Sequence, residues 1–590
     1  MTRVKVIMSG NEAMARGAWE AGVTVAASYP GTPATQILEE LARFDEIHAQ
    51  WSPNEKVALD VVFGASLGGA RAMASMKHVG VNVAADSLMT IAYAGVGGGL
   101  VLVSADDPHM YSSQNEQDNR NFAPFAKIPM IEPASPQEAK DMTRRAFEVS
   151  EAFDVPVLLR ATTRLCHGRG VVEPGTRVNV PLKPYEKDYE KYMMLPTVAR
   201  KRRLDLLGRM ERLEELSEAF PGNRVIGGSS ELGIISSGTA SLYAREAVPD
   251  ASFLILAFTW PLPRRLIRSF AGTVKKLVVV EELDPFLETH IKAMGIEVTG
   301  KDVLPSVGEL RPEIVAAALR PDVRPVARSL SVAPPPRPPA LCPGCSYRPV
   351  FYLLRQLKAR VMGDIGCYAL GAYPPLGAMD MNLCMGASIG VAHGMEKALR
   401  KGGKERGRIV GVIGDSTFVH AGIAPLMDLV YNKGTCTVLL LDNATTAMTG
   451  HQDHPGSGKT AEGEETAAVD YVKLAQAVGL KRVIEAEPYN VGKLRSVLKQ
   501  ELDGDEPSLV ILRAPCALTA MRRPTHFSLV DPEKCKNCDM CFMLGCHPIE
   551  KDDDGRARVN PAWCVGCGVC VQVCGRKAMS LEKREGGVGS

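Results

Sequence analysis

The chain lacks a long apolar segment of the kind that crosses a membrane. Its longest run without a charged residue extends from Ser87 to Ala105, contains four glycines, and divides into a helical part and a strand at Leu100–Val103. The opening residues, MTRVKVIMSG, lack the apolar core of a secretory signal and are typical of a first strand. We therefore expect no membrane association and a cytoplasmic location.

An excess of charge of either sign is also missing. The 69 basic and 67 acidic residues leave a formal net charge of +2, so no basic surplus is available for nucleic acid or an anionic membrane. A phosphate-binding P-loop is absent as well. The glycines of Gly95–Gly99 precede a strand instead of following one, and Gly458-Lys459-Thr460 has Asp453 where that motif requires glycine.

Cysteine, in contrast, is abundant, with fifteen residues in a chain that has no secretory features. This favours metal or cluster ligation over a disulfide framework. Eight cysteines lie in residues 526–590 as two runs, spaced x2-x2-x4 and x2-x2-x3. Such runs typically bind two [4Fe–4S] clusters, each run giving three thiolates to one cluster and its fourth to the other. Zinc is the alternative, since it also takes four thiolates. The runs are Cys535, Cys538, Cys541, Cys546 and Cys564, Cys567, Cys570, Cys574.

A βαβ unit occupies residues 408–450. Two short apolar runs, Ile409–Ile413 and Thr437–Leu441, are typical of strands buried in a parallel sheet, and a helical segment lies between them. Asp415 follows the first strand and Asn443 the second. Ligands bind at such strand ends in open α/β sheets, and a carboxylate with an amide or carbonyl oxygen suits Mg²⁺ bound to a phosphate. An ordinary βαβ turn is the alternative interpretation.

Other segments show the same alternation of strands and helices, and the chain is long enough for about four domains. Strands are predicted at Val4–Met8 and Val23–Tyr29, with a helix at Asn11–Ala21 between them. A helical pattern opens after Trp51 and continues through Met76. In this pattern Ser52, Pro53 and Glu55 fit a capping box, with Ser52 as N-cap and Glu55 as the third helical residue.

These patterns predict a multidomain α/β protein with a small cysteine-rich domain at its end. The segment 321–340 contains seven prolines and is expected to form an extended linker. The predicted parts are residues 1–192, 193–320, the linker 321–340, 341–520 and 526–590.

The βαβ unit resembles the thiamine diphosphate (ThDP) enzymes, whose signature is Gly-Asp-Gly followed after some distance by Asn. Here Gly414-Asp415-Ser416 is followed by 26 residues and then Asn443, and Ser416 departs from the third glycine. The resemblance implies two doubly wound ThDP folds: a pyrimidine-binding domain at 1–192 and a diphosphate-binding domain at 341–520. Residues 193–320 resemble the C-terminal domain of transketolase-like enzymes.

Over essentially its whole length the chain resembles the large (alpha) subunits of indolepyruvate:ferredoxin oxidoreductases, within the 2-oxoacid:ferredoxin oxidoreductase family. Ser346-Tyr347 departs from the expected Pro-His, and in the tail the first cysteine run is one residue longer than usual and Gly575 replaces proline. The stretches that carry the resemblance are Tyr29–Pro33, Asn54–Ala58, Met76–Gly80, Cys342–Cys345, Gly363–Tyr368, Asp442–His451 and the two tail runs.

The resemblance implies oxidative decarboxylation of an aryl 2-oxoacid, with coenzyme A (CoA) and ferredoxin, to an arylacetyl-CoA. It also implies a separate smaller beta subunit carrying the ketoacid-oxidoreductase domain, in a heterotetramer. Glu55 would hydrogen-bond the pyrimidine ring of ThDP and support removal of the thiazolium proton. Asp415, Asn443 and the carbonyl of Thr445 would hold Mg²⁺. Further ThDP contacts would come from Ile365, Gly366, Cys367, Gly386, Gly414 and Ser416. The loop after Asn443 also carries His451 and His454, which could contact substrate or diphosphate or be solvated loop histidines.

A third, proximal [4Fe–4S] cluster is implied for Cys342, Cys345, Cys367 and Cys516, which leaves Cys166, Cys384 and Cys436 as non-ligands. Buried thiols without a cluster are the alternative. Two further interpretations of the whole chain remain open at this point. One is a non-oxidative ThDP decarboxylase or synthase with structural clusters. The other is an electron-transfer subunit without catalytic activity.

Overall fold

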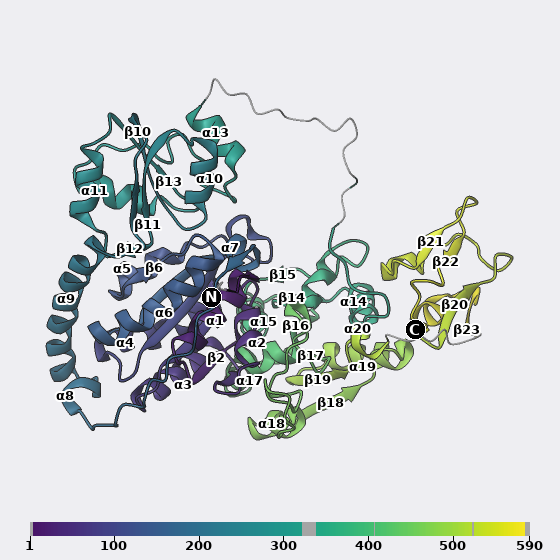
Figure 1. Ribbon diagram of the computed structural model, residues 1–590. Helices are drawn as coiled ribbons and strands as arrows, with labels where there is room; N and C mark the ends of the chain where they lie inside the picture. The colour runs from purple at the N-terminus through teal and green to yellow at the C-terminus, as the bar shows by residue number, and fades with distance from the viewer. Residues whose placement is uncertain (1–3, 321–334, 336–337, 406, 522–523, 585–590) are drawn as a thin grey trace. The chain divides into compact units, whose positions relative to one another are not determined.

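The computed structural model describes residues 4–320, 335, 338–405, 407–521 and 524–584. The chain divides into two compact units, Met1–Ser331 and Val332–Ser590 (Figure 1). Most of the predicted linker 321–340 lies outside the described residues. Within the described ranges, no helix combines the length and apolarity needed to cross a membrane.

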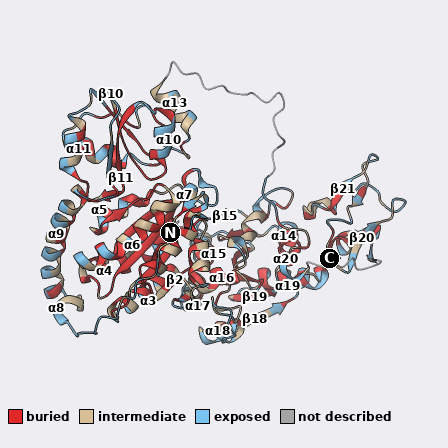
Figure 2. Ribbon diagram, viewed as in Figure 1, coloured by how far each residue is buried: buried red, intermediate tan, exposed pale blue. Residues whose placement is uncertain are grey.

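The larger sheet of the first unit has seven strands in the order β12-β6-β7-β5-β4-β2-β3. Neighbouring strands are parallel except β12 and β6. Every residue of β4, β5 and β7 is buried, as expected where helices cover both faces of a parallel sheet (Figure 2). The strands are β2 (Val25–Ser28), β3 (His48–Trp51), β4 (Ala72–Lys77), β5 (Leu100–Asp106), β6 (Met130–Ile131), β7 (Val157–Thr162) and β12 (Phe258–Trp260), and the helices are α1 (Gly10–Glu20), α2 (Thr35–Leu41), α3 (Glu55–Leu67), α4 (His78–Ala94), α5 (Phe122–Ala126), α6 (Pro136–Phe153) and α7 (Thr163–His167).

A second sheet in this unit has the order β13-β10-β11-β9, with β9 antiparallel to β11. Because β12 follows β11 in the chain but pairs with β6, hydrogen bonds link this part to the larger sheet. A separate antiparallel pair joins β1 to β8. The elements are β1 (Val6–Ser9), β8 (Arg169–Val172), β9 (Arg224–Ile226), β10 (Ser229–Ser237), β11 (Ala251–Leu256), β13 (Lys276–Val280), α8 (Tyr189–Tyr192), α9 (Pro196–Glu218), α10 (Ala240–Ala247), α11 (Arg264–Ala271), α12 (Phe286–Ala293) and α13 (Pro312–Leu319).

The predicted boundaries of the helix after Trp51 are wrong at both ends, because α3 spans Glu55–Leu67. Its N-cap is Asn54, whose side chain accepts a hydrogen bond from the Val57 N–H, so Glu55 is the first helical residue. The capping box with Ser52 is therefore not formed. The helix α3 ends at Leu67 before Gly68, and Ala72–Lys77 form the buried strand β4.

The second unit contains a six-stranded parallel sheet in the order β15-β14-β16-β17-β19-β18. All residues of β16 and β17 are buried, which agrees with their continuous apolar sequences. The elements are β14 (Arg360–Gly363), β15 (Met381–Asn382), β16 (Ile409–Gly414), β17 (Thr437–Asp442), β18 (Arg482–Ala486), β19 (Ser508–Arg513), α14 (Tyr347–Gln356), α15 (Ala387–Lys401), α16 (Asp415–Thr417), α17 (Ile423–Tyr431), α18 (Tyr471–Ala477), α19 (Val491–Asp503) and α20 (Ala517–Ala520).

The cysteine-rich tail packs against this sheet domain. One hydrophobic core includes Val350 and Leu494 of α14 and α19 together with Leu544 and Val569 of the tail. The described part of the tail contains two small antiparallel sheets, one short α-helix and the 3-10 helix Phe542–Leu544, so the cysteines are held mainly by loops. The sheets pair β20 (His526–Val530) with β23 (Met579–Lys583) and β21 (Ile549–Lys551) with β22 (Ala557–Val559), and the α-helix is α21 (Val569–Val573). The predicted α/β class is confirmed.

Candidate functional site

The polar residues predicted to hold Mg²⁺ lie together where β16 and β17 end. The two strands pair in parallel with Gly414 opposite Leu441, so Asp415 and Asn443 emerge at the same edge. The Asn443 N–H donates to Asp415 Oδ2 at 3.1 Å, and the Thr445 N–H donates to Asn443 Oδ1 at 3.1 Å. Ser416, which departs from the glycine of the ThDP signature, hydrogen-bonds Thr446 through its hydroxyl at 3.0 Å.

Asp442 brings a second carboxylate to the same edge. Burial and the neighbouring charge of Asp415 raise its pKa to about 6. Arg513 Nε lies 3.2 Å from Asp442 Oδ2, but the arginine is more than half exposed, which weakens its compensation of the charge. Two close carboxylates in a buried place need a cation, so this donor set fits a divalent metal ion.

Two buried side chains face Asp415 from the loop and helix that follow β17. His454 Nε2 lies 3.3 Å from Asp415 Oδ2 without the alignment of a hydrogen bond, while its Nδ1 accepts from the Gly456 N–H at 3.1 Å. Tyr471, on α18, is 2% exposed, and its hydroxyl has no hydrogen-bond partner among the described residues. Burial, together with the charges of Asp415 and Asp442, raises the Tyr471 pKa. An unsatisfied buried hydroxyl is costly, so the site has unused hydrogen-bonding capacity for a polar ligand.

The predicted glycine contacts surround the ring of Tyr368. A Cβ added at Gly366 or Gly414 would come within 2.4 or 2.8 Å of that ring, so only glycine allows this packing. The Ile365 carbonyl accepts hydrogen bonds from the Tyr368 and Thr417 hydroxyls. Gly386 precedes α15 with φ +85°. After Asp415 the helical path contains one π turn, Phe418–Gly422, a deviation often found at functional sites.

The four cysteines suggested for a proximal cluster line one cavity of about 70 Å³. Asn443 and His451 line the same cavity, so it adjoins the strand-end site. Cys516 Sγ lies 3.5 Å from His451 Nε2. Burial raises the pKa of Cys367 to about 11 and that of Cys345 to about 12, with neighbouring thiols adding to the shift of each. Thiols placed this way stay protonated until a metal or cluster stabilises the thiolates. The four are Cys342, Cys345, Cys367 and Cys516.

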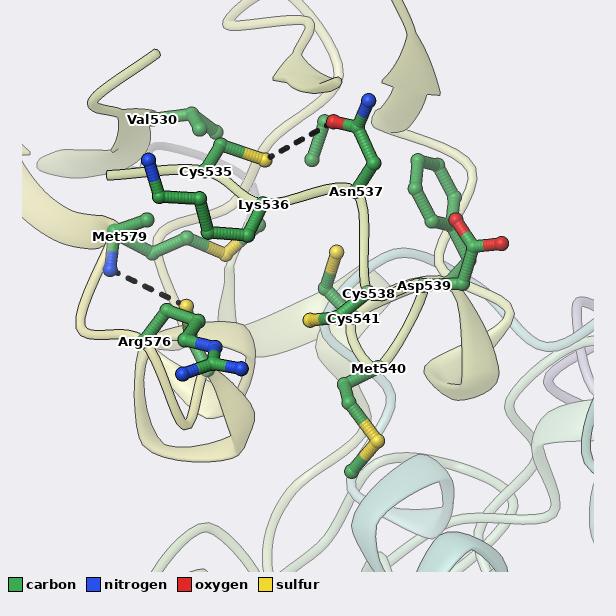
Figure 3. Close-up of a pocket in the computed structure, with 14 residues that line it drawn as sticks. Val530, Cys535, Lys536, Asn537, Cys538, Asp539, Met540, Cys541, Arg576 and Met579 are labelled. Carbon is green, nitrogen blue, oxygen red and sulfur yellow. Dashed lines mark hydrogen bonds between the residues drawn. The ribbon is translucent and has the colours of Figure 1, made fainter. Parts of the chain in front are cut away.

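The eight tail cysteines line two further cavities, four in each. The outer cavity, shown in Figure 3, combines three cysteines of the first run with the last of the second, Cys574. The inner cavity combines Cys546, the last of the first run, with three of the second. Each set therefore takes three thiols from one run and one from the other, the arrangement of two-cluster ferredoxins. The outer set is Cys535, Cys538, Cys541 and Cys574, and the inner set is Cys546, Cys564, Cys567 and Cys570.

The thiols of each set line a cavity of their own. Among the described residues, no three His, Cys, Asp or Glu side chains are placed as ligands of a single metal ion. The Ala578 N–H donates to Cys574 Sγ, and the Ser528 N–H donates to Cys564 Sγ, each at 3.3 Å. Such N–H···S bonds stabilise cluster thiolates. One sulfur of each set, Cys574 outside and Cys564 inside, thus has a backbone donor that would stabilise a bound thiolate.

The three remaining cysteines line none of these cavities. Cys166 and Cys436 are buried, and Cys436 Sγ donates to the Ala392 carbonyl at 3.3 Å. Cys384 is exposed before α15. Cys436 therefore has an internal hydrogen-bond partner and the other two stand apart from the clustered thiols.

Glu55 belongs to the first unit. It is 5% exposed and packs against α4 at Gly80, where an added Cβ would lie 2.6 Å from Glu55 Oε1. The residue before α4, Lys77, has a pKa lowered by burial to about 8, and its ammonium donates to the Ser112 carbonyl. Glu55 is thus a buried carboxylate at a helix start, with a glycine keeping space beside it.

Sequence reasoning missed Arg348 and Tyr471. The guanidinium of Arg348 is buried and donates to the carbonyls of Cys342, Leu544 and Gly545, joining the first cysteine pair to the tail. Its position three residues after Cys345 was the available signal. Tyr471 lies far along the chain from both strand ends, so no local pattern pointed to it.

Three family models match the chain. A pyruvate flavodoxin/ferredoxin oxidoreductase ThDP-binding model covers residues 16–204, a thiamine pyrophosphate enzyme C-terminal TPP-binding model covers 364–512, and a 4Fe-4S binding model covers 557–580. The first two include Glu55 and the strand-end site respectively, and the third includes the second cysteine run.

Curated relatives match nearly end to end. Indolepyruvate oxidoreductase subunit IorA of Archaeoglobus fulgidus is 41% identical, over 98% of both chains. The subunit of the same name from Pyrococcus horikoshii is 38% identical, over 97% of this chain and 96% of that one. A 2-oxoglutarate synthase subunit KorA from Methanothermobacter thermautotrophicus is 24% identical over 51% of this chain and 94% of its own. The chain therefore belongs to the indolepyruvate oxidoreductase subunit IorA family, within the ThDP-dependent 2-oxoacid:ferredoxin oxidoreductases.

Proposed function

We propose that this chain, with a partner subunit, oxidatively decarboxylates aryl 2-oxoacids such as indolepyruvate. The products would be an arylacetyl-CoA, CO₂ and reduced ferredoxin. The observation that carries the proposal is the four-cysteine cavity that shares Asn443 and His451 with the strand-end site. A cluster bound in this cavity would lie beside the proposed cofactor site and could accept electrons there, which a non-oxidative decarboxylase or synthase does not need.

ThDP, when bound, supplies the electron sink that allows CO₂ to leave a 2-oxoacid. We propose that Asp415, Asn443 and the Thr445 carbonyl hold Mg²⁺ against its diphosphate. Tyr471 and His454, buried beside Asp415, would satisfy further diphosphate oxygens. Ile365, Gly366, Cys367, Gly386, Gly414 and Ser416 are proposed to contact the cofactor around this edge.

Asp415→Ala tests this assignment, because removal of the central carboxylate should abolish retention of Mg²⁺ and ThDP. Bound ThDP is measured in the purified protein after desalting, with Asp505→Ala, which changes an exposed residue of the same unit, as the control. A stoichiometric amount of ThDP in the Asp415 variant would contradict the assignment.

For Glu55 we propose a hydrogen bond to the pyrimidine ring of ThDP. A buried carboxylate in that position would hydrogen-bond the ring of a bound cofactor and so assist removal of the thiazolium proton. The space kept by Gly80 beside Glu55 supports a positioned carboxylate. The protein's own contribution to this step would be the Glu55 carboxylate, which would orient the pyrimidine ring and accept a hydrogen bond from it.

The oxidation removes two electrons, whereas a [4Fe–4S] cluster takes one at a time. We propose three clusters, held by the cysteine sets of the proximal, inner and outer cavities. Cys345 lines both the proximal and the inner cavity, which supports a continuous electron path. The path would run from the cofactor through the proximal and inner clusters to the outer one.

We infer that a smaller beta subunit supplies the ketoacid-oxidoreductase domain, which has no counterpart among the sequence segments recognised in this chain. The relatives are named as subunits, which supports a hetero-oligomeric enzyme, and we propose a heterotetramer that works in the cytoplasm.

The decisive experiment is an anaerobic assay of the chain with its partner subunit against a panel of 2-oxoacids. We expect ferredoxin reduction that depends on both CoA and an aryl 2-oxoacid, with the arylacetyl-CoA as product. Release of aldehyde or ketol without ferredoxin reduction would establish the non-oxidative alternative instead.

A further inference from the structure

His451 lies against one of the four cysteines of the proximal set. Its Nε2 is 3.5 Å from Cys516 Sγ, within hydrogen-bonding distance of a sulfur atom. Both residues line the proximal cavity, and His451 is half-buried there. When Cys516 binds a cluster its sulfur is a thiolate and can only accept a hydrogen bond, so the imidazole must carry a proton on Nε2 and donate it.

The segment that carries His451 also holds Cys516 at its backbone. The Cys516 N–H donates to the Asn443 carbonyl at 3.3 Å, and Asn443 and His451 both lie in the loop that follows β17. Cys516 is therefore attached at two points, its N–H and its sulfur, to the loop that begins at the proposed Mg²⁺ ligand Asn443.

The backbone of this loop restricts where the imidazole can lie. His451 has φ +70°, a left-handed conformation that is uncommon for residues other than glycine, and it follows Gly450. The His451 N–H donates to the Thr446 carbonyl at 3.0 Å, and the Thr446 N–H donates to the Gln452 carbonyl at 2.9 Å. Gln452 is buried, and its side-chain amide is hydrogen-bonded to Thr449. These bonds close the loop and hold the ring beside Cys516.

The lining of the proximal cavity gives this donor a large electrostatic effect. None of the described residues that line it is Asp, Glu, Lys or Arg. The charge of Arg348 acts on Cys342 and Cys345 from beyond this lining, whereas His451 contacts Cys516 itself. Reduction of a [4Fe–4S] cluster adds one electron, and so one negative charge, without breaking a bond or moving a proton. An N–H group directed at a ligand sulfur stabilises that added charge, and such hydrogen bonds help to set the reduction potential.

We propose that His451 is a positioning residue for electron transfer, which donates from Nε2 to Cys516 Sγ and thereby raises the reduction potential of the proximal cluster. The proposal rests on the proposed function and, within it, on the cluster assigned to the proximal set. In the tail, Cys574 and Cys564 receive hydrogen bonds from backbone N–H groups, which a substitution does not remove. At Cys516 the donor is a side chain, so the potential depends on the residue at position 451.

The test is His451→Leu, which removes the donor, in the full enzyme with its partner subunit, purified without oxygen. The reduction potential is measured by EPR during titration with dithionite and redox mediators, and the proximal signal is identified as the one that Cys516→Ala lacks. At a fixed potential we expect the ratio of reduced to oxidised proximal cluster to fall about tenfold, which corresponds to a shift of about −59 mV for one electron. The potentials of the tail clusters should not change.

Two further variants at the same position separate the donor from the backbone. His451→Gln keeps an N–H group that can reach the sulfur, so the potential should return toward the wild-type value. His451→Gly adopts the left-handed backbone freely but has no donor, so it should match the leucine variant. If the glycine variant keeps the wild-type potential, the shift in the leucine variant comes from a rearranged backbone and the proposal is wrong.

A matched control makes the same change at another histidine. His547 follows the tail cysteine Cys546, but it is exposed and lines none of the three cysteine cavities. His547→Leu should leave the proximal potential unchanged. An equal shift in this control would overturn the proposal, because the effect would not depend on contact with Cys516.

Iron and ThDP contents distinguish this proposal from the proposed function. His451→Leu should retain about twelve iron atoms per chain and as much ThDP as the wild type. Loss of ThDP with an unchanged proximal potential would show that His451 contacts the diphosphate instead, and the proposal would be wrong. A wild-type enzyme with about eight iron atoms would also overturn it, but the proposed function would stand if an aryl 2-oxoacid and CoA still reduce ferredoxin.

Discussion

Asp442 and Asp415 carry adjacent carboxylates at the ends of neighbouring strands. Their repulsion makes the free energy of folding depend on pH. The folded state raises the Asp442 pKa from 3.8 to about 6 because the group is buried and faces Asp415. The unfolded chain loses this proton at a lower pH than the folded chain does. Folding stability therefore falls as pH rises from about 4 to about 6, and the loss persists at higher pH.

Asp442→Asn removes that cost while keeping the oxygen that accepts from the Ala444 N–H. In protein stripped of Mg²⁺ and ThDP, we expect the variant to unfold at a higher temperature than the wild type at pH 7.5. The gain should be smaller at pH 5, by on the order of 1 kcal/mol. Thermal unfolding at the two pH values measures it. Saturating Mg²⁺ and ThDP should shrink the gain, and a gain that is equal at both pH values would contradict the explanation.

A proposed catalytic role of Glu55 can be tested apart from helix capping, because Asn54 is the residue that caps α3. Glu55→Gln keeps the size and most hydrogen bonds of the side chain but removes its charge. We expect decarboxylation to fall by about two to four orders of magnitude with little change in melting temperature. Single-turnover formation of CO₂ with saturating ThDP gives the rate.

The matched control for capping is Asn54→Ala, which removes the hydrogen bond to the Val57 N–H and should cost about 1 kcal/mol of stability. A Glu55→Gln enzyme with nearly normal turnover would show that the carboxylate is structural.

At the scale of helices and strands, apolar runs were the reliable signal. The strands at Ile409–Gly414 and Thr437–Asp442 agree with prediction within one residue because a strand buried on both faces is continuously apolar. The boundary after α3 was missed because Ala72–Lys77 is rich in Ala and Met, which favour helices on their own. Burial in the sheet decides its conformation, and the local sequence does not contain that information.

Helices α3 and α4 contact each other through a glycine, and this contact gives a prediction. Gly80→Ala would place a Cβ 2.6 Å from Glu55 Oε1, so the carboxylate must move. We expect turnover to fall while ThDP is still bound. The measurements are single-turnover decarboxylation and the dissociation constant of ThDP.

Gly64→Ala in α3 is the matched control, because nothing lies within 4 Å of its added Cβ. There the usual helix preference for alanine should apply, with a stability gain of up to about 1 kcal/mol and unchanged turnover. If both variants behave alike, the close approach of Gly80 to Glu55 has no functional role.

At the scale of the whole chain, the sequence identified the cysteine sets but not how the tail is attached. The regular spacing of the tail runs follows from the geometry of a cubane cluster and is therefore visible locally. The docking of the tail depends on scattered residues, such as Gln572, whose amide donates to the Tyr489 carbonyl and accepts from the Val491 N–H. Single contacts of this kind leave no periodic pattern. The proximal set is intermediate, because its cysteines come from four separate places in the chain.

The number of clusters is the property of the whole molecule that the proximal set decides. One cavity next to the strand-end site is lined by Cys342, Cys345, Cys367 and Cys516. Cys516 lies directly before α20. If the four cysteines bind a cubane cluster, anaerobically purified protein should contain about twelve iron atoms per chain, whereas the tail alone accounts for about eight. Cys516→Ala should lower the content to about eight and slow reduction of the tail clusters by 2-oxoacid and CoA.

Cys384→Ala, which changes an exposed thiol outside every cysteine cavity, serves as the control and should keep the full iron content. An iron content of about eight in the wild type, unchanged in Cys516→Ala, would mean that these thiols are buried side chains without a cluster, and the electrons would then have to reach the inner cluster without an intermediate centre.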